Sequence, residues 1–235
     1  MKVVEIKKHG GPEVLYIGSR PIPKPNKKEV LIKVKAAGIN RPDILQREGA
    51  YPPPKDASDI LGLEISGKVI ELGKNTKNIK IGDKVCALVS GGGYSEYCLA
   101  PYTQCLPIPN NMSFEEAAVI PETFFTIWFN LFIKNKIKKN QKILIHGGSG
   151  GIGTTAIQFA KNFGLKVFTT TRGNKKKEMC KKIGAHYSIN VNKTNFEEFI
   201  NKETKKGTRL NQIMRHTIGL FHGQKGSSYW KRYLS

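Results

Sequence analysis

Cysteine is scarce in this sequence, and its pattern is not that of a disulfide framework or a metal site. The four cysteines are Cys86, Cys98, Cys105 and Cys180, and no two of them form a C-x-x-C pair. Buried free thiols are therefore their expected state. The sequence also lacks a metal-spaced histidine cluster and a Ser–His–Asp order, so neither competes as the origin of a function.

Long apolar runs are absent as well. The N-terminal MKVVEIKKHGG lacks the apolar stretch of a signal peptide. The most apolar segment, residues 117–133, is interrupted by Pro121, Glu122 and Asn130 and falls short of the roughly 20 apolar residues that a membrane span needs. We therefore expect a cytoplasmic protein without a membrane partner. At 235 residues, 39% of them hydrophobic, the chain can form one large or two smaller domains around a buried core.

Acidic residues are few. The sequence has 18 Asp and Glu against 39 Lys and Arg, which gives a formal net charge of +21. Such a charge can indicate a nucleic-acid partner. The lysines are spread along the chain, however, and isoleucine and asparagine are also plentiful, as in a genome biased toward A and T codons. We favour that explanation and keep RNA or DNA binding as the minority interpretation.

Residues 1 to about 110 have the pattern of an all-β domain. In EVLIKVKAAGI, Val30, Ile32 and Val34 fall on one face of a strand, and Leu31 falls with two lysines on the other. The segments SGKVIELG, GDKVCALV and GYSEYCLA repeat this alternation between turn residues. Many short strands separated by such turns predict a small barrel or sandwich.

From Ser113 onward the pattern changes to helices alternating with strands. SFEEAAVI has the form of a capping box, with Ser113 as N-cap and Glu116 three residues later. A helix over 124–134 precedes a strand, a glycine-rich turn and a helix, and then KVFTTT, KKKEMCKKIG, HYSINV and NFEEFINKETKKG alternate in the same way. The order predicts parallel βαβ units, so the fold class is α/β: a β domain followed by part of a doubly wound parallel sheet.

The glycine-rich turn has the spacing of a dinucleotide site. In QKILIHGGSGGIGTTAIQFAKNFG, the G-x-G-x-x-G pattern falls at Gly148, Gly150 and Gly153, after a strand and at the start of a helix. We expect Gly148 to permit the tight turn, Gly150 to admit a pyrophosphate and Gly153 to let the helix lie close to the strand. The alternative is a glycine-rich turn without a ligand, and the complete strand–turn–helix–strand context favours the cofactor.

The next strand end favours NADP(H) over NAD(H). An NAD site has Asp or Glu there, about 20 residues beyond the glycines, to bind the ribose 2′-hydroxyl. This strand instead ends in TTTRGNKKK, where Arg172, Lys175, Lys176 and Lys177 offer cations to a 2′-phosphate. A solvated basic helix start is the competing interpretation in so lysine-rich a chain.

These residues belong to a wider resemblance that covers residues 1 to about 211. The chain resembles the medium-chain dehydrogenase/reductase superfamily, and within it the zinc-free NADPH:quinone oxidoreductases, especially the p53-inducible quinone oxidoreductase type. The resemblance implies a GroES-like β-barrel domain over 1–118, a partial Rossmann domain that binds NADP over 119–211, and an active-site cleft between them. The segments that carry it are GGPEVL, AAGINRPDILQREGAYPPP, LGLEISGKVIELG, IGDKVCAL, GGGYSEY, IPETFFT, ILIHGGSGGIGTTAIQFAK and KKIGAHYSINV.

The same comparison indicates that the ancestral zinc is lost. Zinc alcohol dehydrogenases of this superfamily have Cys in a G-I-C-x-x-D element and His in G-H-E, where this chain has Asn40 and Leu63. The third metal position is Glu122. Since zinc needs three or four N, S or O ligands, we expect no metal. Hydride delivery to an electrophilic quinone or enone is then favoured over alcohol oxidation.

The resemblance further implies individual site residues. The expected catalytic residues are Asn40, Asp43 and Tyr51, of which Tyr51 could orient an acceptor or relay a proton. Arg41 and Gln46 would line the nicotinamide side, Thr126 would contact the carboxamide end of the cofactor, and the phosphates would lie on Gly148, Gly150, Gly151, Ile152, Gly153, Arg172, Lys175 and Lys176. Alternatively, Asn40 and Asp43 only close a turn and Tyr51 only packs a loop. One departure is Val191, where many relatives have a tyrosine that lines the adenosine phosphate.

Beyond residue 211 the family pattern stops. Residues 212–235 show no fourth strand, and no acid follows Glu203. A frameshift near Met214 would explain the break, and a genuine short variant with a basic tail is the alternative. The later Rossmann strands and the dimerising edge strand of relatives are missing, so we expect weak NADPH binding, low activity and no homodimer of the kind that full-length relatives form.

Three functions stay open on the sequence alone. The leading one is an NADPH-dependent, metal-free oxidoreductase that acts on a small-molecule quinone, impaired by truncation. The second is an NADPH-dependent reductase of enone or enal double bonds. The third, from a different class, is a non-catalytic basic remnant that binds nucleic acid.

Overall fold

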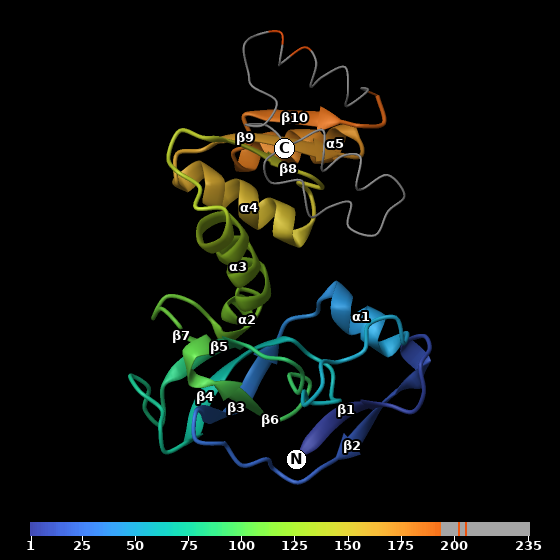
Figure 1. The fold of residues 1–235 in the computed structure, drawn as a ribbon. Coiled ribbons are helices and arrows are strands. Elements are labelled where there is room, and N and C mark those ends of the chain that lie inside the picture. The colour runs from blue at the N-terminus through green and yellow to red at the C-terminus, as the bar shows by residue number, and fades with distance from the viewer. Residues whose placement is uncertain (194–201, 203–204, 206–235) are drawn as a thin grey trace. The chain divides into compact units, whose positions relative to one another are not determined.

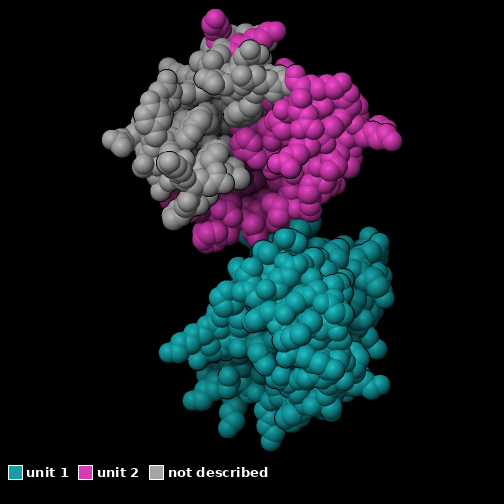
Figure 2. Space-filling view, turned by 90° about the vertical axis from the view of Figure 1, so that its right-hand side faces the viewer, with its two compact units in different colours: residues 1–125 teal, residues 126–235 magenta. Residues whose placement is uncertain are grey.

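The computed structural model describes residues 1–193 together with Lys202 and Lys205. The chain forms two compact units, Met1–Phe125 and Thr126–Ser235 (Figure 2). This division lies within a helix, whereas the sequence placed the domain boundary after residue 118. The predicted helix NFEEFINKETKKG lies almost wholly outside the described residues, and the predicted tail, residues 212–235, lies entirely outside them.

The order of the elements matches the predicted change from strands to alternating strands and helices (Figure 1). The elements of the first part are β1 (Lys2–Ile6), η1 (Pro12–Val14), β2 (Leu15–Ser19), β3 (Glu29–Ala37), α1 (Arg41–Arg47), β4 (Glu64–Leu72), β5 (Lys84–Leu88), β6 (Tyr97–Pro101), η2 (Tyr102–Gln104), β7 (Cys105–Pro107) and α2 (Phe114–Ala118). Those that follow are α3 (Pro121–Trp128), a π-helical turn η3 (Phe129–Lys134), β8 (Lys142–Ile145), α4 (Gly151–Asn162), β9 (Lys166–Thr171), α5 (Asn174–Ile183) and β10 (Tyr187–Asn190).

The first unit is built on a five-stranded antiparallel sheet in the order β6-β3-β4-β5-β7, with β1 and β2 as a separate antiparallel pair. Val30 and Ile32 of β3 are buried against Ile65 and Val69 of β4, as the alternation in the sequence predicts. Leu31 was expected on the exposed face, and that expectation is wrong. Leu31 is as buried as its neighbours Val30 and Ile32, so both faces of β3 are covered at this point. The β-bulge beside it has its extra residue, Ile70, in β4 and leaves the register of β3 with β6 unbroken.

Helix α2 begins where the sequence predicts. The Ser113 backbone N–H donates to Glu116 Oε2 at 2.9 Å, and the Glu116 N–H donates to Ser113 Oγ at 3.1 Å. This reciprocal capping box satisfies two amides that the helix itself cannot bond. The helix expected over 124–134 is present as α3, which starts earlier at Pro121, and its continuation η3.

The second unit contains a parallel sheet in the order β10-β9-β8. Helices α4 and α5 pack against this sheet and against each other, so they cover the same face of it. Ile157 and Ala160 of α4 and Val167 of β9 are fully buried in the core. The predicted parallel βαβ units are confirmed for β8-α4-β9 and β9-α5-β10.

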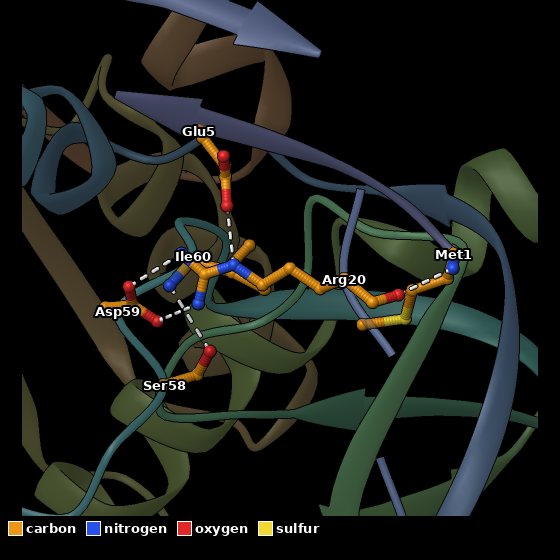
Figure 3. A network of polar contacts seen from close by, with 6 residues as sticks. All are labelled: Met1, Glu5, Arg20, Ser58, Asp59 and Ile60. Atoms are coloured by element: carbon orange, nitrogen blue, oxygen red, sulfur yellow. Dashed lines mark hydrogen bonds and ion pairs between the residues drawn. The ribbon is translucent and has the colours of Figure 1, made fainter. Parts of the chain in front are cut away.

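An ion-pair cluster ties the N-terminal hairpin to the loop before β4 (Figure 3). The guanidinium of Arg20 bonds Glu5 through Nε and both oxygens of Asp59, at 2.7 and 2.9 Å. The N-terminal ammonium of Met1 donates to the carbonyl of Arg20 at 2.7 Å. Arg20 lowers the pKa of Asp59, and Tyr16 together with Arg20 lowers the pKa of Glu5.

This cluster predicts that acid loosens the loop that carries Asp59. An acid whose pKa is lowered by folding stabilises the fold above its ordinary pKa of about 4 and loses that contribution as the pH falls through the lowered value. We expect amide hydrogen exchange at residues 56–60, corrected for the intrinsic rate, to accelerate below about pH 4. In Arg20→Met, exchange should be fast at every pH, and Lys24→Met should behave like the wild type. Unchanged protection in Arg20→Met would contradict this account.

Candidate functional site

The turn after β8 is closed by glycines, but the tightest point is not where the sequence placed it. Gly147 adopts a positive φ of 68°, the left-handed region that glycine tolerates. The Gly150 N–H donates to the Gly147 carbonyl at 3.0 Å, and the Gly148 N–H donates to the Thr170 carbonyl of β9 at 3.0 Å. The tight turn therefore depends on Gly147 and not on Gly148, which corrects the assignment made from the spacing.

Gly148 and Gly153 are required by packing. A Cβ on Gly148 would overlap the Thr169 hydroxyl and lie 3.1 Å from Ile157 Cδ1. A Cβ on Gly153 would overlap the Gly147 carbonyl oxygen and lie 2.7 Å from Gly148 Cα. Helix α4 can thus approach β8 and β9 closely only while both positions lack a side chain, and for Gly153 this confirms the predicted role.

Gly150 differs from both because nothing fills the space beside it. A Cβ there would meet only the Gly147 carbonyl oxygen, at 3.6 Å. Gly150 is the N-cap of α4, and it has no side chain that could accept from the first amides of the helix. The N–H groups of Gly151, Ile152 and Gly153 have no intrahelical acceptor. They form an uncapped, positively polarised helix end beside open space, which fits a phosphate group.

Cationic residues follow the end of β9, the strand next to β8 in the sheet. Arg172, Lys175 and Lys176 are exposed, and no acid lies among residues 166–177. The buried side chain of Asn190 organises this loop: its Oδ1 accepts from the Gly173 N–H at 3.0 Å, and its Nδ2 donates to Asn174 Oδ1 at 2.8 Å. Sequence reasoning missed Asn190. An amide residue at the end of a buried strand was the available signal, since such a residue needs partners.

In the first unit, the predicted pair Asn40 and Asp43 lies at the start of α1. Asn40 is the N-cap, and its N–H donates to Asp43 Oδ2 at 2.7 Å. The Asp43 carboxylate also accepts from the Tyr94 hydroxyl at 2.9 Å and from the Gly62 N–H at 3.2 Å. Asp43 is buried, and its oxygens accept from three donors, so it holds the start of α1, the 60–62 turn and Tyr94 together.

Glu64, which sequence reasoning missed, is the second buried carboxylate of this network. Its Oε1 accepts from Asn40 Nδ2 at 2.8 Å and its Oε2 from the Glu122 N–H at 2.9 Å, so it joins β4 to the starts of α1 and α3. Burial raises the pKa of Glu64. Burial, with the nearby charges of Glu64 and Asp43, also raises the pKa of Glu122. The signal in the sequence that could have identified Glu64 was its position next to Leu63, in the GLE element.

The remaining predicted residues lie apart from this network. Arg41 is exposed in the first turn of α1, and Tyr51 is exposed in the proline-rich loop. Gln46 is buried, and its Nε2 lies 3.5 Å from the Asp59 carbonyl. Thr126 belongs to α3 in the second unit, where its carbonyl accepts from Asn130 Nδ2 at 2.8 Å. The structure thus groups Asn40 with Asp43, and the glycines with the uncapped end of α4.

Glu64 gives a prediction for stability against pH. A raised pKa means that the fold favours the neutral acid, so the contribution of Glu64 is present below its ordinary pKa and is lost as the pH rises through the raised value. We expect Glu64→Gln to make the unfolding free energy less dependent on pH between about 4 and 8. Glu64→Ala should cost about 2–4 kcal/mol because it leaves two buried donors unsatisfied.

The measurement is chemical denaturation of the full chain at several pH values. Glu71→Gln, at an exposed position of the same strand, is the matched control and should leave the pH profile unchanged. A Glu64→Gln profile parallel to that of the wild type would show that Glu64 does not carry the effect.

Comparison with known proteins agrees with these geometries. Residues 26–110 match the family model "Alcohol dehydrogenase GroES-like domain", and residues 151–214 match "Zinc-binding dehydrogenase". Quinone oxidoreductase 1 of Escherichia coli is 33% identical over 232 residues, which cover 98% of this chain and 68% of that protein. The chain spans 58% to 62% of the length of the mammalian quinone oxidoreductases that it also matches.

Solved structures show the same likeness. The Escherichia coli quinone oxidoreductase in complex with NADPH superimposes with a TM-score of 0.76 at 33% identity, over 87% of this chain and 63% of that one. The CurK enoyl reductase superimposes with a TM-score of 0.77 at 29% identity, over 87% of this chain and 64% of that one.

Proposed function

We infer the function from one premise: the chain belongs to the quinone oxidoreductase family of the medium-chain dehydrogenase/reductase superfamily, with a GroES-like domain followed by part of a Rossmann domain. From it we propose an NADPH-dependent oxidoreductase that passes reducing equivalents to a quinone-type acceptor without a metal. The observation that carries the proposal is the uncapped N-terminus of α4 beside the open space at Gly150, in a chain similar to a protein that binds NADPH.

In this proposal the second unit holds the cofactor through its phosphates. The amides of Gly151, Ile152 and Gly153 would bind the pyrophosphate, and the exposed cations Arg172, Lys175 and Lys176 would bind the 2′-phosphate. With no acid among residues 166–177, the loop gives a ribose 2′-hydroxyl no carboxylate to bond, which supports NADP(H) over NAD(H). Bound NADPH would supply a hydride to the acceptor.

The residues at the ancestral metal positions support metal-free chemistry. The Asn40 side-chain nitrogen donates to Glu64, and the Leu63 side chain has no atom that can ligate a metal. Glu122, at the third of these positions, lies in the first turn of α3. Among the described residues, no group of three His, Cys, Asp or Glu side chains is placed to hold a metal ion. An acceptor that stabilises negative charge by itself, such as a quinone ring, suits a site without a Lewis acid.

The polar residues of the first unit would serve the acceptor and the nicotinamide. We propose that Asn40 and Tyr51 contact these groups, and that Asp43 acts as a positioning residue, because its carboxylate is already occupied by three donors. We propose, as the family resemblance implies, that Arg41 and Gln46 line the nicotinamide side of the site and that Thr126 contacts the carboxamide end of the cofactor. The NRPDILQREGAYPPP and IPETFFT segments further support placing the chain with the p53-inducible type of the family.

A second candidate is reduction of a conjugated carbon–carbon double bond. The likeness to CurK enoyl reductase favours it, and an enone accepts hydride at carbon under the same metal-free conditions. The two candidates share one cofactor site and differ only in the acceptor. A panel of quinones and enones, assayed with NADPH, therefore distinguishes them.

The cofactor site predicts a contrast between two variants. Gly150→Ala should leave the melting temperature unchanged because its Cβ meets only one atom, but the methyl group occupies the space beside the helix amides. We expect both NADPH and NADH to bind about tenfold more weakly, or roughly 1.4 kcal/mol. Arg172→Ala should weaken NADPH by a similar factor and leave NADH unchanged, since only NADPH has the 2′-phosphate.

The measurement is titration of NADPH and NADH fluorescence with the full chain. Lys74→Ala, an exposed lysine of the first unit, is the charge control and should have no effect. If Gly150→Ala binds NADPH with wild-type affinity, the N-terminus of α4 is not part of the cofactor site.

The function itself is tested by oxidation of NADPH in the presence of a soluble quinone. We expect slow but measurable turnover by the 235-residue chain, insensitive to a metal chelator and lowered about tenfold by Gly150→Ala at subsaturating NADPH. Turnover as fast as that of a full-length quinone oxidoreductase would refute the proposed impairment. If the chain binds no dinucleotide but binds oligonucleotides in a salt-sensitive way, the proposed oxidoreductase function is wrong and a nucleic-acid-binding protein is favoured.

A further inference from the structure

The second unit carries an exposed cluster of large apolar side chains that the proposed function does not use. We call it the aromatic face, and it consists of residues from the α3–η3 helix and from α4 with the turn that follows it: Trp128, Phe129, Phe132, Ile133, Phe159 and Phe163. The ring centroids of Trp128 and Phe132 lie 4.7 Å apart, and those of Phe132 and Phe163 lie 4.6 Å apart. The ring of Phe159 stacks on that of Phe163 at 5.9 Å.

Four of the six side chains of the aromatic face are exposed, and Phe132 and Phe159 are half-buried against the core. Trp128 is 44% exposed, Phe163 43%, and Phe129 and Ile133 each 56%. Phe129 and Ile133 are four residues apart on one helical segment, so they lie next to each other. Scattered exposed apolar residues are normal, but a contiguous group of this size with a tryptophan indicates an interaction surface.

Lysines border the aromatic face. A hollow beside it is lined by Phe132, Phe163, Lys138, Lys139 and Lys161, so these three lysines lie close to two of the rings. Lys134 and Lys136 follow Ile133 within three residues. Between residues 126 and 193 the sequence has fourteen Lys and Arg and a single acid, Glu178, which lies near Lys181 at 3.7 Å. Glu178 is on α5 and is not among the residues that line this hollow.

We propose that the aromatic face docks on the surface of an anionic phospholipid bilayer. Trp128, Phe129 and Ile133 would enter the headgroup region, and the bordering lysines would contact lipid phosphates and carboxylates. No helix among the described residues is long and apolar enough to cross a membrane, so the contact is peripheral. The lack of a spanning segment in the sequence predicted no membrane partner, but docking on a membrane surface needs no span.

The arrangement fits a lipid surface better than a nucleic acid. The rings of Trp128, Phe132 and Phe163 pack against one another at interplanar angles of 33° and 48°, so their faces are not presented singly for stacking with bases. Ile133 has no ring at all. An apolar centre with a cationic border is the pattern of an interfacial anchor. The inference is independent of the proposed reductase activity.

The test uses the full chain with Trp230→Phe, which leaves Trp128 as its single tryptophan. The probes are vesicles of phosphatidylcholine alone and of phosphatidylcholine with phosphatidylserine. We expect co-sedimentation only with the anionic vesicles, weakening as salt is added, and a blue shift of Trp128 emission on binding. Phe129→Ser with Ile133→Ser should weaken binding by roughly tenfold or more. Lys138→Glu with Lys139→Glu should weaken it by at least about fivefold per lysine.

Matched controls keep the result specific. Lys74→Glu with Lys77→Glu, and Ile81→Ser, change equally exposed residues of the first unit and should not affect binding. The inference is overturned if these controls weaken binding as much as the variants of the aromatic face, or if Trp128 emission does not shift. It is also overturned if the chain binds only oligonucleotides, or if Phe129→Ser with Ile133→Ser abolishes a dimer and vesicle binding is absent.

Discussion

The uncapped N-terminus of α4 is the feature on which the cofactor site depends. A helix end whose amides lack acceptors costs free energy unless water or a ligand bonds them. Four glycines keep this end open by different means: Gly147 turns the chain at positive φ, Gly148 and Gly153 bring α4 against the sheet, and Gly150 leaves the space beside the amides empty. A Cβ on Gly148 or Gly153 would move the helix, one on Gly150 would fill the space beside the amides, and one on Gly147 would strain the turn at its positive φ. The glycine spacing therefore encodes both the packing and the proposed binding.

The first unit depends on a different constraint, the burial of acids. Asp43 and Glu64 are each almost inaccessible to solvent, at 3% and 2% exposure. A buried carboxylate is tolerated only where donors compensate for lost hydration, and here the donors are backbone amides, an asparagine amide and a tyrosine hydroxyl from separate segments. The two acids therefore fix the geometry of α1 and of the start of α3. The cost that remains appears as the raised pKa of Glu64, because burial outweighs its two hydrogen bonds.

Local patterns in the sequence predicted most of the described fold, because they report interactions between near neighbours. The capping box of Ser113 and Glu116 involves two residues three positions apart, and the alternation in β3 reports only which face is buried. The failures involve partners distant in the chain. The burial of Leu31 depends on what covers the second face of β3, and the roles of Glu64 and Asn190 depend on donors 58 and 17 residues away. Gly147 was missed because the motif counts glycines and does not specify which one adopts positive φ.

The excess of positive charge acquires a more specific meaning once it is divided among surfaces. In the sequence the lysines are spread evenly, and codon bias explained them without a partner. In the second unit, with one acid among residues 126–193, the cations fall into at least two groups of different chemistry. Arg172, Lys175 and Lys176 follow the strand end beside a helix N-terminus, where the polar surroundings suit a phosphate ester. Lys138, Lys139 and Lys161 border exposed rings, where the apolar surroundings suit a ligand with both charge and hydrocarbon. The same charge can attract different anions because the neighbouring side chains, and not the charge itself, select among them.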